Sequence, residues 1–241
     1  LAGTVLFGSG RLMRSKFDLT VAGLTLLLLS PLLGLVALAI LAERKGPVLF
    51  KQVRVGHLGR PFDIFKFRTM VVGAESLGSS VTVAGDQRVT RLGRFLRRTK
   101  LDELPQLWNV VRGEMALVGP RPEVPEIVAY YTPEMRRILT ILPGLTSVAS
   151  LDLFDEEGLL AGANDPDDFY IKVLVPAKVS YAMVHVDDRS FRLELATLWR
   201  TAAAALNRML GKSSGGELMS RMRESLIAAN EADYHVVEDS A

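Results

Sequence analysis

An uncharged stretch at residues 19–42 lies between Asp18 and Glu43, near the start of this chain. A helix of that length, at about 1.5 Å per residue, reaches across a hydrocarbon layer of about 30 Å. The stretch is too long for the apolar part of a secretory signal peptide, and it lacks a small-residue cleavage pattern. It therefore predicts a membrane-embedded helix, and the rest of the fold has to leave that helix in contact with lipid.

Ser30 and Pro31 interrupt this stretch near its middle. Proline cannot donate to the carbonyl four residues earlier, so it kinks or breaks the helix, and the Ser30 hydroxyl can satisfy part of the freed backbone. Basic residues stand at both ends: Arg11, Arg14 and Lys16 before it, Arg44 and Lys45 after it. A crossing helix is expected to have one end depleted of basic residues. The pattern favours a re-entrant helix with both ends on one side of the membrane, and the alternative is a kinked spanning helix.

The remainder of the 241-residue chain is long enough for one domain with a sizeable core. Residues 48–55 and 62–68 resemble strands on either side of a glycine-containing loop, which predicts a β-hairpin. The pattern predicts helices at 88–98, 105–111, 167–185 and 190–210 and a helical region at 125–142, and residues 73–86 are expected to form a loop. We expect a mostly helical α+β fold in three parts: an N-terminal segment with the membrane helix (1–45), a compact domain on the membrane surface (46–210), and a linker with a peripheral tail (211–241).

Two adjacent acids, Asp102 and Glu103, precede Pro105, a residue that favours the first position of a helix. A capping role is the plainest interpretation, because Thr99 to Asp102 matches a capping box and acids there gain from the helix dipole. Residues 88–100, however, contain six basic residues and no acidic one. Such a field would keep Asp102 ionised and attract a phosphorylated substrate. An ionised carboxylate can attack phosphorus, while a neighbouring carboxylate helps to hold Mg²⁺.

Arginines recur at every third position in this basic segment, at Arg88, Arg91, Arg94 and Arg97. For the first three, a surface facing solvent or anionic lipid is at least as good an interpretation as catalysis. Arg97 is nearest to the acids, and we expect it to bind a phosphate. In Gly119-Pro120-Arg121-Pro122 the restricted backbone either forms a rigid turn or holds the Arg121 guanidinium for bidentate phosphate contact. The absence of cysteine excludes disulfides, thiolate metal sites and cysteine nucleophiles.

Six short motifs in a fixed order resemble the bacterial sugar transferase family, the small monotopic phosphoglycosyl transferases, over about residues 17–201. They are Ser30-Pro31, Gly46-Pro47-Val48-Leu49-Phe50, Lys66-Phe67-Arg68-Thr69-Met70, Asp102-Glu103-Leu104-Pro105-Gln106, Gly119-Pro120-Arg121-Pro122 and Pro143-Gly144-Leu145-Thr146. Each motif is weakly specific by itself. The ordered set is what carries the resemblance.

The resemblance implies transfer of a sugar 1-phosphate from a UDP-sugar to undecaprenyl or another polyprenyl phosphate, with release of UMP. It further implies that Asp102 is the nucleophile that carries the phosphosugar, and that Glu103 joins it in binding Mg²⁺. Lys66, Arg97 and Arg121 resemble the basic residues that bind substrate phosphate. Ser30 and Pro31 resemble the break that keeps the membrane helix re-entrant. A catalytic domain on the cytoplasmic face of the bacterial inner membrane is expected, where it would begin assembly of an exopolysaccharide, an O-antigen or a glycoprotein glycan.

The sequence also departs from the family. Lys100 replaces the usual serine before Leu-Asp-Glu, Ser147-Val148-Ala149 replaces Gly-Leu-Ala, and Glu194 replaces an aspartate. The second change lies in a region that the resemblance links to substrate recognition, so the sequence leaves the sugar open, and pairing into a homodimer as well. The alternative to an enzyme is a non-catalytic module that binds anionic lipid. A nucleic-acid partner is not expected, because no aromatic residues for base stacking are interleaved with the basic segment.

Overall fold

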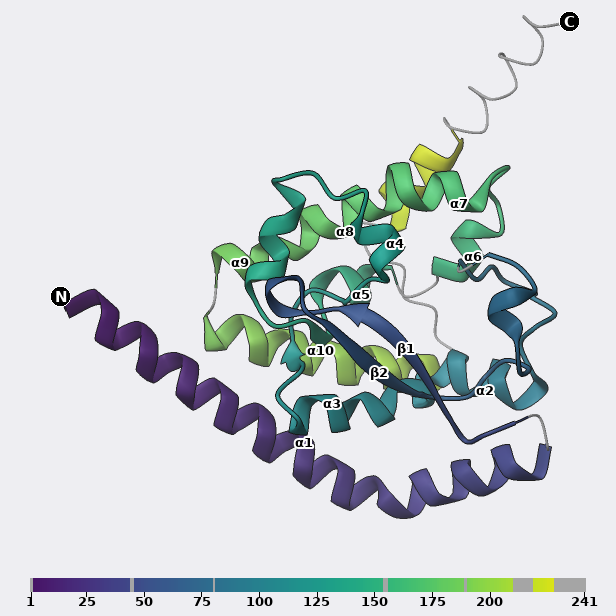
Figure 1. Cartoon of the computed structure of the whole chain (residues 1–241), viewed down its shortest axis with the longest axis horizontal. Helices are drawn as coiled ribbons and strands as arrows, with labels where there is room; N and C mark the ends of the chain where they lie inside the picture. Colours follow the sequence, from purple (N-terminus) through teal and green to yellow (C-terminus); the bar gives the residue numbers. More distant parts are fainter. Residues whose placement is uncertain are drawn as a thin grey trace, which may run out of the picture.

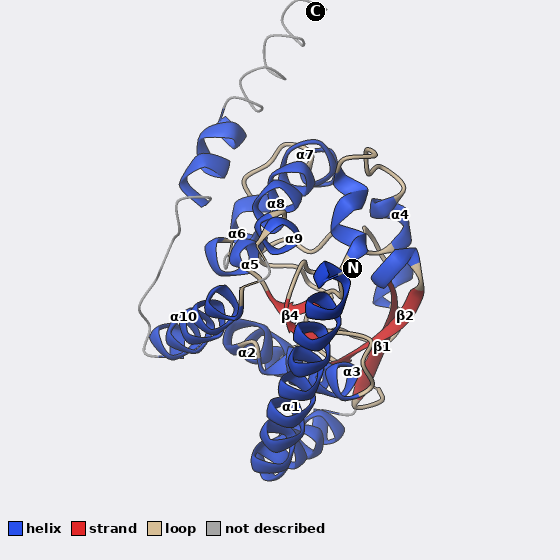
Figure 2. Cartoon of the chain, turned by 90° about the vertical axis from the view of Figure 1, so that its left-hand side faces the viewer, coloured by secondary structure: helices blue, strands red, loops and turns tan. Residues whose placement is uncertain are grey.

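The computed structural model describes residues 2–43, 46–79, 81–153, 156–188, 190–209 and 219–227. Its labelled helices are α1 (Ala2–Glu43), α2 (Arg91–Thr99), α3 (Leu107–Val111), α4 (Pro125–Val128), α5 (Val148–Asp152), α6 (Glu156–Leu160), α7 (Pro166–Phe169), α8 (Val175–Ala182), α9 (Val184–Asp187) and α10 (Phe191–Met209). Its strands are β1 (Leu49–Val55), β2 (Pro61–Phe67), β3 (Ala116–Val118) and β4 (Gly144–Thr146). Figures 1 and 2 show a mostly helical body with small sheets, lying on the inner side of the bent α1. The predicted α+β class is confirmed.

Helix α1 continues through Pro31, and its axis changes direction in Figure 1. The Ser30 hydroxyl donates a 2.8 Å hydrogen bond to the carbonyl of Leu27, the group that Pro31 leaves without its helical donor. On the outer side of the bend the leucines are exposed, with Leu27 70% and Leu28 78% accessible. The proline therefore bends the helix without ending it, and the bend presents an apolar surface.

Both arms of α1 pack against the same body. In the first arm Ala22 is fully buried in a cluster that includes Leu107 and Val110 of α3. In the second arm Val36 and Ile40 pack in a cluster with Leu96 of α2. The two ends of the bent helix are thus held beside one domain. The expected re-entrant path through a membrane stays a prediction.

The β-hairpin is confirmed. Strands β1 and β2 pair in antiparallel register, from Leu49 opposite Phe67 to Val55 opposite Pro61. Just after β2, the carbonyl of Thr69 lies so close to α2 that a Cβ on Gly93 would be 2.0 Å from it. Glycine at position 93 therefore lets α2 lie directly against the end of the hairpin.

A second, parallel pair of strands was not predicted. Ala116 of β3 pairs with Gly144 of β4, and Val118 pairs with Thr146. Gly119 directly follows β3, and its backbone lies so close to Gly144 that a Cβ on Gly144 would be 2.1 Å from the Gly119 nitrogen. Three-residue strands are too short for a periodic sequence signal, and it is the two glycines that mark their contact.

Two predicted helices begin or end elsewhere. Helix α2 begins at Arg91 and not at Arg88, because the Thr90 side chain caps it by accepting from the Gly93 nitrogen. The helical region predicted at 125–142 is confirmed in part, as α4 and a separate 3₁₀ turn, Met135–Thr140. Pro133 lies between them, and proline disfavours helical geometry at the residue before it. The predicted helix at 167–185 is confirmed as a helical region, composed of α7, a π-helical stretch Tyr170–Leu174, α8 and the start of α9.

The main hydrophobic core lies beneath α8. Leu174, Val175 and Val179 contribute to it, and the described helical residues 219–227 add Met219 and Met222, which are 4% and 8% exposed. This part of the predicted tail therefore packs on the domain. The predicted boundaries near residues 45 and 210 fall at 44–45 and 210–218, which lie outside the described residues.

Candidate active site

The two acids lie in a 3₁₀ turn, Leu101–Gln106, directly after α2. Lys100 joins the two elements in a left-handed conformation, with φ 59° and ψ 16°, which is unusual for a residue other than glycine. The capping box expected from Thr99 does not form, because the Thr99 hydroxyl donates to the carbonyl of Phe95 within α2. The sharp reversal at Lys100 turns Asp102 inward, where it is 6% exposed.

Glu103 is held in a network of ion pairs. Arg121 donates to both carboxylate oxygens, at 3.0 and 2.6 Å, and the Lys66 Nζ lies 3.9 Å from Oε1. Burial would raise the pKa of Glu103, but Arg121 and Lys66 outweigh it and hold that pKa well below its usual range. Burial lowers the pKa of Lys66 to about 7, although the charge of Glu103 acts in the opposite direction. We call Lys66, Asp102, Glu103 and Arg121 the Asp102 cluster.

Asp102 has a different environment from its neighbour. Its Oδ1 is buried, and no described residue forms a hydrogen bond with it; the same is true of both amide atoms of Gln106, in the same turn. Burial raises the pKa of Asp102, and the charge of Glu103 adds to this, against Lys66, Lys100 and Arg97. Desolvation thus outweighs the cations in setting the direction of this shift, and the expectation that Asp102 is ionised stays a prediction. Adjacent acids with pKa values pushed in opposite directions are typical of catalytic sites.

Arg97 faces the same site from α2. Its Nε donates to the Thr69 hydroxyl at 3.0 Å, and its Nη1 lies 2.6 Å from Oε1 of Glu157 in α6. Its charge is among those that act on Asp102. The five predicted residues thus lie within one electrostatic neighbourhood, with Lys66, Glu103 and Arg121 in direct contact. Ser30 and Pro31 are exposed in α1 and do not contribute to this cluster.

The other arginines of the basic segment have separate roles. Arg88 is mostly buried in the loop before α2, where it pairs with Asp86 at 2.7 Å and donates to the carbonyls of Ala74 and Ser79. It therefore holds the loop together and does not belong to a lipid-facing row. Arg91, Arg94 and Arg98 are exposed on α2.

A second buried network lies beside the first and was missed. The Lys178 Nζ contacts Glu123, Glu156 and Tyr170, at 3.1, 3.3 and 2.9 Å. Tyr170 and Arg54 also donate to Glu123, at 2.8 and 3.2 Å. We call Arg54, Glu123, Tyr170 and Lys178 the Glu123 cluster. Its members come from distant segments, and the sequence signal for it was Lys178, the one charged residue of α8.

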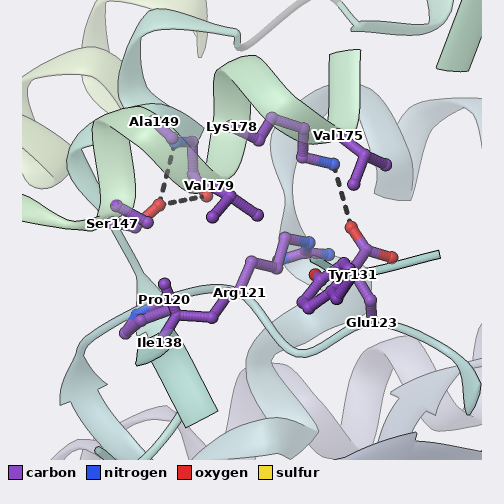
Figure 3. Close-up of a pocket in the computed structure, with 12 residues that line it drawn as sticks. Pro120, Arg121, Glu123, Tyr131, Ile138, Ser147, Ala149, Val175, Lys178 and Val179 are labelled. Carbon is purple, nitrogen blue, oxygen red and sulfur yellow. Dashed lines mark hydrogen bonds and ion pairs between the residues drawn. The ribbon is translucent and has the colours of Figure 1, made fainter. Parts of the chain in front are cut away.

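The Glu123 cluster adjoins a small pocket, which Figure 3 shows with Arg121, Tyr131 and Ser147 on its walls. The cavity measures about 20 Å³, which is room for a water molecule and not for a sugar. Burial would raise the pKa of Glu123, but Lys178 and Arg54 lower it to about 2. Arg121 of the Asp102 cluster and Glu123 and Lys178 of the Glu123 cluster all line this pocket, which is too small for a substrate.

The predicted Mg²⁺ can be tested against these contacts. Among the described residues no group of three His, Cys, Asp or Glu side chains could hold a metal ion. The buried Oδ1 of Asp102, without a hydrogen-bond partner, fits one Mg²⁺ ligand, and Mg²⁺ commonly takes its other ligands from water and substrate phosphates. Glu103 fits as a second protein ligand only if it gives up a contact with Arg121. The site fits a metal that arrives with a phosphorylated substrate.

Comparisons with known proteins show the family of this chain. The sequence model of the family described as bacterial sugar transferase matches residues 9–208. The chain is 54% identical over 116 residues to an undecaprenyl-phosphate glucose phosphotransferase of Komagataeibacter xylinus, covering 48% of this chain and 22% of the relative. It is 46% identical over 143 residues to a UDP-glucose:undecaprenyl-phosphate glucose-1-phosphate transferase of Caulobacter vibrioides, covering 58% and 54%.

A third relative has a different sugar in its name. The chain is 38% identical over 169 residues to a UDP-N-acetylgalactosamine-undecaprenyl-phosphate N-acetylgalactosaminephosphotransferase of Aeromonas hydrophila, covering 66% of this chain and 39% of the relative. The chain thus spans between 22% and 54% of the length of these three proteins. Because the family match covers most of the sequence, from α1 into α10, the chain belongs to the bacterial sugar transferase family.

Proposed function

We propose that this protein transfers a sugar 1-phosphate from a UDP-sugar to undecaprenyl phosphate, or to another polyprenyl phosphate, and releases UMP. The names of the relatives support both substrates, and they include glucose and N-acetylgalactosamine as cargo. The product would be the lipid-linked sugar diphosphate from which a surface glycan (an exopolysaccharide, an O-antigen or a glycoprotein glycan) is assembled.

The observation that carries the proposal is the contrast within the acidic pair. Glu103 is fully engaged by cations, whereas Asp102 keeps a buried oxygen free of described hydrogen bonds beside the same cations. A desolvated carboxylate among positive charges is suited to attack an anionic phosphorus centre. Helix capping requires neither the burial of Asp102 nor the bidentate partner of Glu103.

The proposed reaction has two displacements. A carboxylate oxygen of Asp102 attacks the phosphorus that bears the sugar, the bond from that phosphorus to the bridging oxygen breaks, and UMP leaves with this oxygen. An oxygen of the polyprenyl phosphate then attacks the same phosphorus and breaks its bond to Asp102. The carboxylate is regenerated, so neither step requires an oxidant or a net change in protonation of Asp102.

The basic residues have separate parts in this proposal. Arg97 and Arg121 would contact phosphate oxygens, and Lys66 would balance charge that builds up on the transferred group. Mg²⁺ bound at Asp102, with Glu103 as a further ligand, would neutralise phosphate charge and favour the ionised form of Asp102. Arg121 contacts Glu103 now, so its engagement of phosphate requires a change of partner.

The bent α1 supports a position at the membrane surface. By length and composition two helical stretches could cross a membrane, Lys16–Glu43 and Pro166–Asp187. The second supplies buried residues to the main core, whereas the first is only 11% buried and exposes its apolar outer side. We infer that α1 enters and leaves on the cytoplasmic face of the bacterial inner membrane. This would bring the site to the level of the acceptor phosphate.

A covalent adduct is the decisive test. The full-length chain in lipid nanodiscs is incubated with Mg²⁺ and one UDP-sugar, without acceptor, and then quenched in acid. Mass spectrometry is expected to find a hexose-phosphate or N-acetylhexosamine-phosphate on the peptide with Asp102, and none in Asp102→Asn. The rival lipid-binding module explains the exposed arginines of α2 but predicts neither an adduct nor UMP. Absence of both with every UDP-sugar tried would refute the enzymatic proposal.

A further inference from the structure

Glu157 is an acidic residue at the site that the proposed chemistry does not use. Its Oε1 lies 2.6 Å from Nη1 of Arg97, and its side chain is still 44% exposed. Its backbone carbonyl accepts a 2.9 Å hydrogen bond from the nitrogen of Ala84, which fixes this part of α6 against the loop before α2. Glu157 is therefore held in place at the edge of the site with part of its carboxylate open to solvent.

The guanidinium of Arg97 has donors left for a ligand. It carries five N–H groups, of which Nε contacts Thr69 and Nη1 contacts Glu157. Among the described residues none accepts from its Nη2. A phosphate that binds at Nη2 would consequently sit beside the Glu157 carboxylate, on the same planar group.

The neighbouring acid shows that this placement is specific. Glu156 points to the Glu123 cluster, where it contacts Lys178 at 3.3 Å. Glu157 instead contacts Arg97, whose charge acts on Asp102. Two consecutive residues of α6 thus pair with different cations, Glu156 with Lys178 and Glu157 with Arg97.

A carboxylate beside a phosphate is unfavourable unless it also gains a contact of its own, because the two negative charges repel. A UDP-sugar supplies that contact, since its diphosphate lies between two rings that carry hydroxyl groups. A hydroxyl that donates to a carboxylate forms a strong, charge-assisted hydrogen bond. Discrimination by such a bond is large when the hydroxyl is missing, because the polar group of the protein is left unpaired.

We propose that Glu157 is a donor-recognition residue, which accepts a hydrogen bond from a hydroxyl of the ribose or of the transferred sugar next to the phosphate on Arg97. This inference rests on the proposed function. A purely structural Glu157 would hold Arg97 in position, and its loss would then weaken the reaction equally for all donors.

The test removes first the hydrogen-bond acceptor on the protein and then the hydroxyl on the UDP-sugar. Glu157→Gln and Glu157→Ala are compared with wild type in nanodiscs, by UMP release from UDP-glucose, UDP-galactose and their N-acetyl counterparts. With the best of these donors, kcat/KM is expected to fall by about 10- to 100-fold, mainly through KM. Asp168→Asn is the matched control, because this acid also forms an ion pair, with Lys172 at 2.7 Å, but on an exposed surface.

Donors that lack one hydroxyl remove the same hydrogen bond from the substrate. With one of the 2′-deoxyuridine, 3′-deoxyuridine or monodeoxy-sugar forms of the donor, wild type is expected to lose its advantage. The ratio of its kcat/KM to that of Glu157→Ala, which has no acceptor, then returns to about 1. UMP as a competitive inhibitor identifies the ring: a higher inhibition constant in the variant assigns the ribose, and an unchanged one assigns the transferred sugar.

Two results would overturn the inference alone, while wild type remains active: kcat/KM unaffected by both substitutions, or a loss of the same size with every deoxy donor. The latter would assign Glu157 to positioning Arg97. A wild type that releases no UMP from any of these donors overturns the proposed function, and the inference with it.

Discussion

Arg121 of the Asp102 cluster and Glu123 of the Glu123 cluster flank Pro122 in the sequence. Both clusters are mostly buried, but they differ in how many of their polar atoms have a hydrogen-bond or ion-pair partner. In the Glu123 cluster both carboxylate oxygens of Glu123 have partners, and Lys178 contacts three acceptors at 3.3 Å or less. In the Asp102 cluster Lys66 reaches its nearest acid only at 3.9 Å, and Asp102 Oδ1 has no described partner.

This difference separates a structural network from a chemical one. A buried polar network with all its members bonded rigidifies the fold, whereas an unbonded member is costly and needs another reason to be present. We infer that the Glu123 cluster fixes the backbone that carries Arg121, while the Asp102 cluster is left incomplete for the substrate. Substitutions in the Asp102 cluster should therefore affect mainly turnover, and substitutions in the Glu123 cluster mainly stability.

Asp102→Asn should have the largest effect on activity. The amide cannot act as the nucleophile, so multiple-turnover UMP release is expected to fall by about 10³-fold or more. The variant is not expected to be less stable than wild type, because the substitution removes a poorly solvated carboxyl and no described hydrogen bond to its Oδ1. Thermal unfolding in detergent checks the second part. Destabilisation comparable to that of a Glu123 cluster variant would contradict the division.

Lys178→Met should show the opposite behaviour. It leaves the Glu123 carboxylate buried without its main cation, and such a broken buried ion pair costs about 3–5 kcal/mol of unfolding free energy. Adding Glu123→Gln to the same chain should recover part of that loss, since the unpaired charge is removed. Urea unfolding of both variants measures this coupling. If the losses simply add, the cluster does not act as one network.

Arg121→Lys keeps the charge but removes the two parallel hydrogen bonds to Glu103. Because a lysine ammonium cannot reproduce this fork, kcat/KM is expected to fall by about 10- to 100-fold. Arg54→Lys is the matched control, since it makes the same exchange in the Glu123 cluster, where Arg54 contacts Glu123 at 3.2 Å. That control is expected to lower stability while turnover by the folded protein is retained. Equal kinetic losses in both variants would mean that the clusters are not separable.

Much of this molecule could be predicted from sequence, where the physical signal is local. The uncharged run predicted α1, alternation predicted the hairpin, and the order of the six motifs predicted the family and five residues that the fold brings into one neighbourhood. The Ser30 hydroxyl also satisfies the Leu27 carbonyl, as its position before Pro31 suggested.

The signals that failed depend on contacts between distant segments. Burial of Asp102 results from the reversal at Lys100 and the packing of β2 against the turn, so its raised pKa is not visible in a run of neighbouring arginines. The partners of Lys178 lie up to 55 residues away, and the pairing of β3 with β4 depends on a backbone approach at two glycines. Arg88 looked like a helix residue because its spacing matched the row, yet its contacts are with a loop.

The smallest expected effect is the dependence of stability on pH, and here the two clusters should respond with opposite signs. The pKa of Glu123 in the folded protein is about 2, below its usual 4.5, so the unfolded chain binds more protons between these values. The stability advantage of wild type over Glu123→Gln should therefore be full above pH 4.5 and decline as the pH falls toward 2.

For Asp102 the folded pKa lies above 3.8, so the folded state binds more protons. Relative to Asp102→Asn, wild type should lose stability as the pH rises above 3.8 toward the raised value. Each difference has a slope of at most about 1.4 kcal/mol per pH unit, and urea unfolding at a series of pH values measures it. Slopes of the same sign would show that Asp102 is already paired in the folded protein, and the contrast between the clusters would then not hold.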